Sequence, residues 1–258
     1  MNKIIMSSFH AIFSIGLMLG SIIGGYLSRH GYDFHTHFYL IALVNLFSIP
    51  IFIPNLLNGE IDGNKKDIPN TSFWNLGSYL TILALVAFCG MLCEGAMADW
   101  ITLYFKENVT LTFYTNTIGF SAFALAMVVG RLSGDYISRK FGIKNVLVLN
   151  GILISLGMMI TLFIPQVEFK IIGCFLTGLG ISTIVPLIYS EAGNQKNIVP
   201  AIAIAGVSTI AYIGFLIGPV VIGYLADIFS LQNALILLII LGLMGSLIAK
   251  TLLPYSAK

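Results

Sequence analysis

Long apolar runs without charges alternate with short polar connections along the chain. Eight runs have the length of roughly 20 residues that a helix needs to cross the hydrocarbon core of a bilayer. They cover residues 4–27, 36–57, 73–99, 111–133, 145–165, 169–190, 199–226 and 231–253. Barrel strands are about ten residues long and alternate in polarity, and a spanning segment must satisfy its own backbone hydrogen bonds. The pattern therefore predicts an all-α fold, a polytopic membrane bundle of eight transmembrane helices.

The first and seventh runs share one pattern of spaced glycines, 198 residues apart. The pattern consists of Ile-Gly, a further Gly and then Gly-Tyr-Leu, and it occupies positions 15–27 and 213–225. Internal duplication on this scale is typical of transporters. Because the copies fall in helices one and seven, the repeating unit is six helices. The chain is therefore expected to begin partway through its first unit.

One connection is long and polar. Residues 58–72 contain Gly59, Gly63 and Pro69, and they follow two helices and precede six. A transporter made of two halves would join its halves at this point. We expect residues 1–57 to be the last two helices of an N-terminal six-helix half, residues 58–72 to be a cytoplasmic linker between the halves, and residues 73–258 to be a complete C-terminal six-helix half.

Composition excludes an ordinary water-soluble domain and helps to orient the chain. Only 9% of the residues are charged and 57% are hydrophobic, whereas about a quarter charged is typical of soluble proteins. Lys and Arg concentrate on the cytoplasmic side of membrane proteins, and eight spans place both chain ends on one face. That face collects ten of the 13 basic residues, Arg131 among them, and leaves Arg29, Lys106 and Lys170 on the other. Both termini are expected in the cytoplasm.

A basic segment after the fourth run carries a family resemblance. Residues 130–135 read Gly-Arg-Leu-Ser-Gly-Asp, and residues 139–142 read Arg-Lys-Phe-Gly. This segment resembles the glycine and basic loop between the second and third helices of each half in the major facilitator superfamily. The resemblance implies a major facilitator fold that lacks helices 1–4 of twelve, and it implies gating roles for Arg131, Asp135, Arg139 and Lys140. A simpler interpretation is that these charges only set the topology.

Two further resemblances concern the function. The segment 94–100, Glu-Gly-Ala-Met-Ala-Asp-Trp, resembles a bacterial inner-membrane branch of that superfamily similar to fucose permeases. The first helix resembles the antiporter motif of proton-coupled drug exporters, although Ser21 stands where that motif has Pro. Sugar transport and drug export therefore both remain open.

Glu94 is the one acidic or basic residue expected deep inside a span. An ionisable group in a membrane costs about 2.5 to 3.5 kcal/mol and usually faces a cavity or a partner. Trp74 and Trp100 are expected as interfacial anchors at the ends of the third span, which places Glu94 about 9 Å inside the outer interface. Its carboxylate is a candidate for binding solute hydroxyls and for carrying a coupling proton. The alternative is a structural hydrogen bond to a neighbouring helix.

Other polar side chains complete the candidate site. His10 is a candidate for proton coupling because imidazole titrates near neutrality, and a hydrogen-bonded packing role is the alternative. In the superfamily that the chain resembles, the first and fourth helices of each half line the central cavity. The candidate solute contacts on cavity-facing helices are Asn116, Thr183, Tyr189, Thr209 and Tyr212. Amide, hydroxyl and phenol groups suit a neutral polar solute, since Glu94 is the only deep charge in this interpretation.

The sequence gives no reason to expect an enzyme, a metal site or a cofactor. It contains no GxSxG, HExxH or phosphate-binding GxxxxGK[ST] motif. Cys89, Cys93 and Cys174 lie within predicted spans and have no nearby His, which favours buried packing residues over metal ligands. Basic residues are dispersed and do not form the patch that nucleic acid binding requires.

These features favour a secondary active transporter, or a fragment of one, in the bacterial inner membrane. We expect it to move a small polar solute, with a sugar as one candidate, by alternating access in symport with a coupling ion. Its expected partners are the lipid bilayer, the small-molecule solute and a separate chain that supplies helices 1–4. The alternatives are a proton-coupled drug exporter and a truncated remnant that does not transport.

Overall fold

The computed structural model describes residues 6–55, 76–110, 115–195 and 198–252. In these ranges every regular element is helical, and eight candidate membrane spans are present. The elements are α1 (Met6–Arg29), α2 (Phe34–Phe52), the 3-10 helix η1 (Ile53–Asn55), α3 (Gly77–Asn108), α4 (Ile118–Phe141), α5 (Ile143–Phe163), α6 (Val167–Ser182), α7 (Ile184–Gly193), α8 (Pro200–Ile228), α9 (Leu231–Ala234) and α10 (Ile236–Leu252). One span joins α6 to α7 and another joins α9 to α10. The predicted all-α bundle of eight spans is confirmed.

Two helices continue past the ends of their apolar runs. α3 reaches Asn108 and α4 reaches Phe141, whereas the hydrophobic pattern ends near residues 99 and 133. The last turn of α4 carries Arg139 and Lys140 on exposed positions, where positive charge stabilises a helix C-terminus. Gly142, with φ of +80°, then ends the helix. The basic segment that was predicted to be a loop is therefore mostly helical.

The segment 58–72, predicted to link two halves, lies outside the described residues, and so does Trp74. The turn before α2 is described and has a clear cap. The Asp33 carboxylate accepts hydrogen bonds from the backbone N–H and the hydroxyl of Thr36, and these bonds lower the pKa of Asp33. This cap satisfies an N–H group that the start of α2 leaves without a partner inside the helix.

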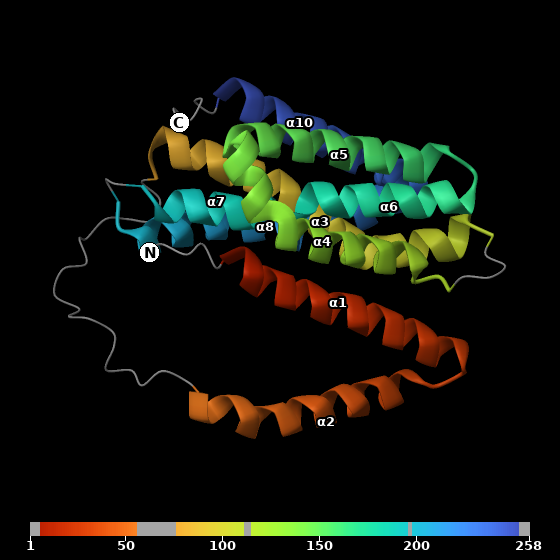
Figure 1. The fold of residues 1–258 in the computed structure, drawn as a ribbon. Coiled ribbons are helices and arrows are strands. Elements are labelled where there is room, and N and C mark those ends of the chain that lie inside the picture. Colours follow the sequence, from red (N-terminus) through yellow and green to blue (C-terminus); the bar gives the residue numbers. More distant parts are fainter. Residues whose placement is uncertain (1–5, 56–75, 111–114, 196–197, 253–258) are drawn as a thin grey trace.

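Helix α3 lies in the middle of the bundle formed by α3 to α10. It packs most extensively against α8 and also against α10, while α5 packs against α6 and α10. Figure 1 shows these helices side by side as one block. Met97, Ile101 and Phe105 of α3 are fully buried at the centre. The block is therefore built around α3.

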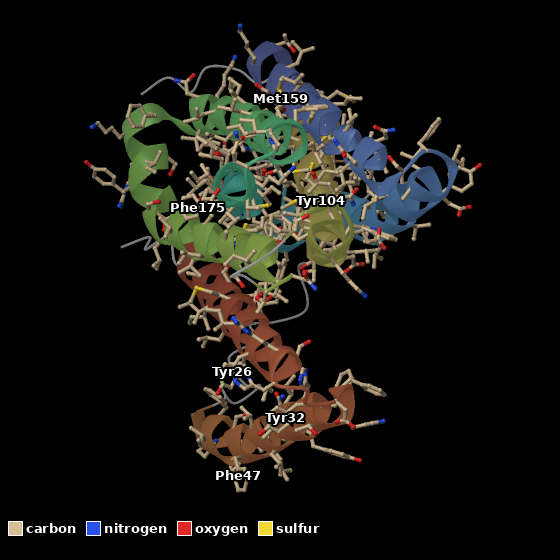
Figure 2. All side chains as sticks on the ribbon, turned by 90° about the vertical axis from the view of Figure 1, so that its right-hand side faces the viewer. Tyr26, Tyr32, Phe47, Tyr104, Met159 and Phe175 are labelled. Carbon is tan, nitrogen blue, oxygen red and sulfur yellow. The ribbon has the colours of Figure 1, made fainter. Side chains whose placement is uncertain are left out.

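The hairpin of α1 and α2 lies at the edge of this block. α1 runs along α4, where Ser21 and Ser121 share a hydrogen bond of 2.7 Å. α2 has no buried residue among its described positions. Figure 2 shows Tyr32 and Phe47 on this hairpin, away from the bundle that encloses Tyr104.

The first two glycines of the internal repeat have different surroundings in the two copies, whereas the third, Gly25 or Gly223, is closely packed in both. An added Cβ would lie 2.5 Å from the Phe88 carbonyl oxygen at Gly214, and 2.6 Å from the Leu92 carbonyl oxygen at Gly218. Glycine therefore allows α8 to approach the backbone of α3 closely. In α1, Gly16, Gly20 and Gly24 have nothing within 4 Å of an added Cβ among the described residues.

Replacing Gly218 by Ala should destabilise the bundle, because its Cβ would collide with a backbone oxygen that cannot rotate away. We expect a loss of about 1 to 3 kcal/mol in the free energy of unfolding, as for other overpacked sites. Thermal unfolding in detergent measures the change. Gly245→Ala is the matched control, since its Cβ would meet its nearest atom, Cys89 Cβ, at 3.6 Å. Equal stability of the two variants would contradict the close α3–α8 contact.

Candidate functional site

Glu94 lies near the middle of α3 and is buried, with 7% of its surface exposed. It precedes the end of α3 by fourteen residues, or about 21 Å at the usual helical rise. The sequence predicts that it lies about 9 Å below the interface, with Trp100 as an interfacial anchor. α3 continues past Trp100 to Asn108, and this depth stays a prediction. The Trp100 indole N–H instead donates to the Pro219 carbonyl oxygen of α8 over 2.9 Å.

Arg131 of α4 holds the Glu94 carboxylate. One guanidinium nitrogen, Nη2, lies 3.3 Å from Glu94 Oε1, and Arg131 is 3% exposed. Its Nη1 donates to the His10 carbonyl oxygen over 3.0 Å and to the Ser14 hydroxyl, both on α1. Its Nε donates to the Ser182 carbonyl oxygen at the end of α6 over 3.2 Å. One side chain therefore ties α4 to α1, α3 and α6.

Sequence reasoning placed Arg131 among the cytoplasmic charges. It lies two residues before the end of the predicted apolar run, close to Asp135 and Arg139, and the sequence pattern groups it with these charges. The structure extends α4 to Phe141 and buries Arg131 ten residues before that end. The signal that could have found it is the neighbouring Gly130, because a Cβ there would collide with the Ser182 side chain of α6. Because α4 and α6 approach each other closely at Gly130, the next residue, Arg131, is buried between helices.

The ion pair is costly to break but not a source of stability in itself. Two charges removed from water lose hydration that their mutual attraction repays only when further hydrogen bonds are present. Arg131 makes these further bonds, because it donates to two backbone carbonyl oxygens and to one hydroxyl. Loss of either charge leaves the other buried without its counter-ion, which typically costs about 3 to 5 kcal/mol.

A cavity of about 460 Å³ opens beside the ion pair. It is lined by residues of α1, α3, α4, α7 and α8, which are His10, Phe13, Met91, Glu94, Arg131, Val185, Tyr212 and Phe215. The guanidinium carbon of Arg131 lies 6.0 Å from the centre of the Phe13 ring, within reach of a cation–π contact. The cavity therefore combines apolar and aromatic walls with one pair of opposite charges, the usual character of a small-molecule site.

The structure brings four of the predicted site residues together around this cavity. Glu94, His10, Tyr212 and Arg131 all line it. Tyr189 lies just behind, with its ring 6.3 Å from the His10 ring. Its hydroxyl is buried and makes no hydrogen bond of ordinary geometry among the described residues, although Ser208 of α8 lies nearby.

Three predicted contacts lie elsewhere. The Thr183 hydroxyl accepts a hydrogen bond of 2.8 Å from Asn150 of α5, so it is already used inside the bundle. The Thr209 hydroxyl donates to the Ala205 carbonyl oxygen of its own helix. Asn116 is exposed in the turn before α4. None of the three lines the cavity. Asn150 itself is buried.

The other predicted gating residues follow Arg131 on α4. Asp135 is half-buried, and Arg139 and Lys140 are exposed near the end of the helix. None of these three residues lines the cavity, and their gating role stays a prediction.

Lys170 is a second buried cation that the sequence assigned to an outer connection. Its ammonium donates to the Tyr104 hydroxyl over 2.9 Å and to the Thr161 carbonyl oxygen over 2.8 Å. It therefore ties the start of α6 to α3 and α5. Neither Arg131 nor Lys170 counts as a loop charge for the topology.

The chain is similar to known membrane proteins over most of its length. Residues 4–194 match the sequence model of the Major Facilitator Superfamily. The membrane protein MosC of Rhizobium meliloti is 30% identical over 92% of this chain and 57% of its own length. An uncharacterized MFS-type transporter of Yersinia pestis is 32% identical over 90% of this chain and 60% of its own. An uncharacterized transporter of Sinorhizobium fredii is 29% identical over 96% and 65%. The chain thus spans about 57% to 65% of the length of these relatives.

A double-mutant cycle tests the coupling of the buried pair. Arg131→Met should lower the free energy of unfolding by about 3 to 5 kcal/mol, because it leaves the Glu94 carboxylate buried and unpaired. Glu94→Met should also destabilise. The double variant should cost less than the sum of the two, since no unpaired charge remains. Denaturation in detergent measures all three, and strictly additive losses would contradict a direct interaction.

Proposed function

Because the chain belongs to the Major Facilitator Superfamily, we propose that it is a secondary active transporter, or part of one, with its solute site in the cavity beside Glu94. The solute is a small polar molecule, with a sugar as the leading candidate, and it crosses the membrane by alternating access. The observation that carries this proposal is the buried Glu94–Arg131 pair in the wall of a cavity of about 460 Å³. Ionisable groups inside membrane spans typically mark solute or proton pathways.

Glu94 is the residue that binds the solute or carries the coupling proton. Only its Oε1 is bonded to Arg131, so Oε2 remains available to accept a hydrogen bond from a solute hydroxyl. Protonation of the same carboxylate would weaken its bond to Arg131 and alter what the cavity binds. His10 lines the same cavity and is the second candidate in a proton path. This arrangement supports symport of solute and proton.

The cavity suits an uncharged solute for a reason that differs from the sequence argument. That argument took Glu94 as the only deep charge, whereas Arg131 is buried beside it. Because the two charges oppose each other, the wall has no net charge while both are ionised. Phe13, Tyr212 and Phe215 add aromatic faces against which an apolar ring face can pack. A sugar offers both such a face and hydroxyl groups.

Drug export is the second candidate, and the mainly apolar lining of the cavity favours it. An apolar compound with one polar group would fit these walls as well as a sugar would. The likeness of residues 94–100 to the fucose-permease-like branch supports the sugar, and the glycine pattern of α1 supports the exporter.

Further parts of the proposal concern the whole transporter. We propose a location in the bacterial inner membrane with both termini in the cytoplasm, in line with the excess of basic residues on one face. Asp135, Arg139 and Lys140 are proposed to gate that face together with Arg131.

Glu94→Gln should strongly lower proton-driven uptake. Membrane vesicles are prepared from cells that express the gene in its native genomic context, so that any complementary segment is present. Uptake of labelled fucose, galactose and glucose is measured with and without an imposed proton gradient, and ethidium efflux is measured in parallel. Removal of one charged hydrogen-bond acceptor should lower transport about tenfold or more.

Glu107→Gln is the control for this change, since Glu107 is an exposed carboxylate near the end of the same helix. Unchanged transport and pH dependence in Glu94→Gln would remove Glu94 from the site. Efflux of ethidium without sugar uptake would favour the exporter, and neither activity would favour a remnant that does not transport.

The orientation can be tested by cysteine labelling, because Cys89, Cys93 and Cys174 are buried. A membrane-impermeant maleimide should label Lys106→Cys in intact cells. It should label Lys140→Cys only after the membrane is permeabilised. The reverse pattern would overturn the proposed orientation of both termini.

A further inference from the structure

The span that contains α6 and α7 is broken at Thr183. Its φ and ψ are −104° and −5°, and α7 starts at the next residue. In a continuous helix the N–H of residue 186 would bond to the Ser182 carbonyl oxygen, but residue 186 is proline and has no N–H. The Ser182 oxygen is therefore left without its usual helical partner. Figure 1 shows α6 and α7 following each other along the bundle.

Arg131 supplies the missing donor. Its Nε lies 3.2 Å from the Ser182 oxygen and donates to it. Gly130 makes this possible, because any larger residue would collide with the Ser182 side chain and separate α4 from α6. On the other side of the break, Asn150 of α5 holds the Thr183 hydroxyl.

The same guanidinium holds Glu94, so the two bonds are mechanically linked. A guanidinium is planar and rigid, and its Nε and Nη2 move as one unit. The bond from Nη2 to Glu94 Oε1 and the bond from Nε to the Ser182 oxygen cannot change independently. When Glu94 is neutral, Arg131 keeps its acceptors on α1 and at Ser182, but it loses the attraction between charges that holds Nη2 in place. The plane of the guanidinium is then less firmly fixed.

Helix α7 connects this point to the end of the bundle. Val185 lines the cavity, and Tyr189 lies against His10 one turn later. Near the end of α7, the Glu191 carboxylate accepts a hydrogen bond of 2.9 Å from the Tyr79 hydroxyl at the start of α3. A change in the angle at Thr183 would therefore move one wall of the cavity and a contact that closes the bundle at that end.

We propose that Arg131 is a positioning residue that couples the charge of Glu94 to the hinge between α6 and α7. While Glu94 is ionised, Arg131 is held in the plane that caps the Ser182 oxygen and fixes the hinge. When Glu94 is neutralised by a proton, the cap is lost and α7 becomes free to move. This inference rests on the proposed role of Glu94 in transport. The titratable groups that face Glu94 besides Arg131 are His10 of α1, Tyr189 of α7 and Tyr212 of α8.

Hydrogen exchange of the α7 backbone in lipid nanodiscs tests the coupling without any solute. Glu94→Gln, which mimics the protonated carboxyl group, should make the amides of residues 184–193 exchange about tenfold faster, since a hydrogen bond from a charged donor is lost. Arg131→Lys should do the same, because lysine keeps the charge but has no Nε positioned for Ser182. Peptides from α5 and α10 should exchange at the rate of the unmodified protein in both variants, which also shows that they fold.

Pro186→Ala is the decisive second change. It restores the N–H that bonds to the Ser182 oxygen, so the hinge no longer needs Arg131. The double variant Glu94→Gln/Pro186→Ala should return α7 exchange to the rate of the unmodified protein. No acceleration in Glu94→Gln, equal acceleration in all helices, or no rescue by Pro186→Ala would each overturn the proposal. Because exchange is measured without solute, this result is separate from the uptake assay: lost uptake with unchanged α7 exchange would defeat only the coupling.

Discussion

A cation buried among apolar helices must find a hydrogen-bond acceptor in every direction in which it donates, and this requirement at Arg131 decides how four helices meet. Its acceptors come from α1, α3 and the end of α6, while its own backbone belongs to α4. None of these helices can shift alone without leaving a polar group unpaired in a medium without water. The cavity lies at this meeting point, and the charged pair forms part of its wall.

A buried ion pair is weak evidence for stability, because apolar residues of similar size often serve a core equally well. If Glu94 carries the coupling proton as proposed, the pair serves a state in which one charge disappears. Glu94 can gain a proton, whereas arginine keeps its charge at any physiological pH. The fixed charge therefore sits at the helix junction, and the variable charge sits on α3 in the cavity wall. This division places the energetic effect of protonation where α6 and α7 are joined.

The sequence predicted the helices and the position of Glu94 inside one of them, but it did not predict the partner of Glu94. A helix that spans a bilayer requires a long uncharged run, so the number of helices can be counted from the sequence. A carboxylate within such a run can be identified in the same way. The burial of Arg131 was not predicted, because an apolar run shows where charged residues begin but does not show that α4 continues to Phe141. The use of the Thr183 hydroxyl by Asn150 depends on α5 packing against α6 and α7. Such pairings require the three-dimensional arrangement.

The contrast between two helix contacts indicates which parts can move. At the α3–α8 contact, Gly214 and Gly218 lie directly against backbone oxygens of α3, and close packing of this kind allows sliding only at the cost of collisions. At the α6–α7 junction the helix is already interrupted. The Ser182 carbonyl oxygen lacks its usual helical partner there and accepts a hydrogen bond from Arg131, whose side chain can rotate. Motion driven by the charge of Glu94 should therefore divide the span at Thr183 and leave α3 and α8 together. With α3 and α8 packed rigidly together and α7 hinged at Thr183, one end of the cavity can open while the wall formed by α3 and α8 stays in place.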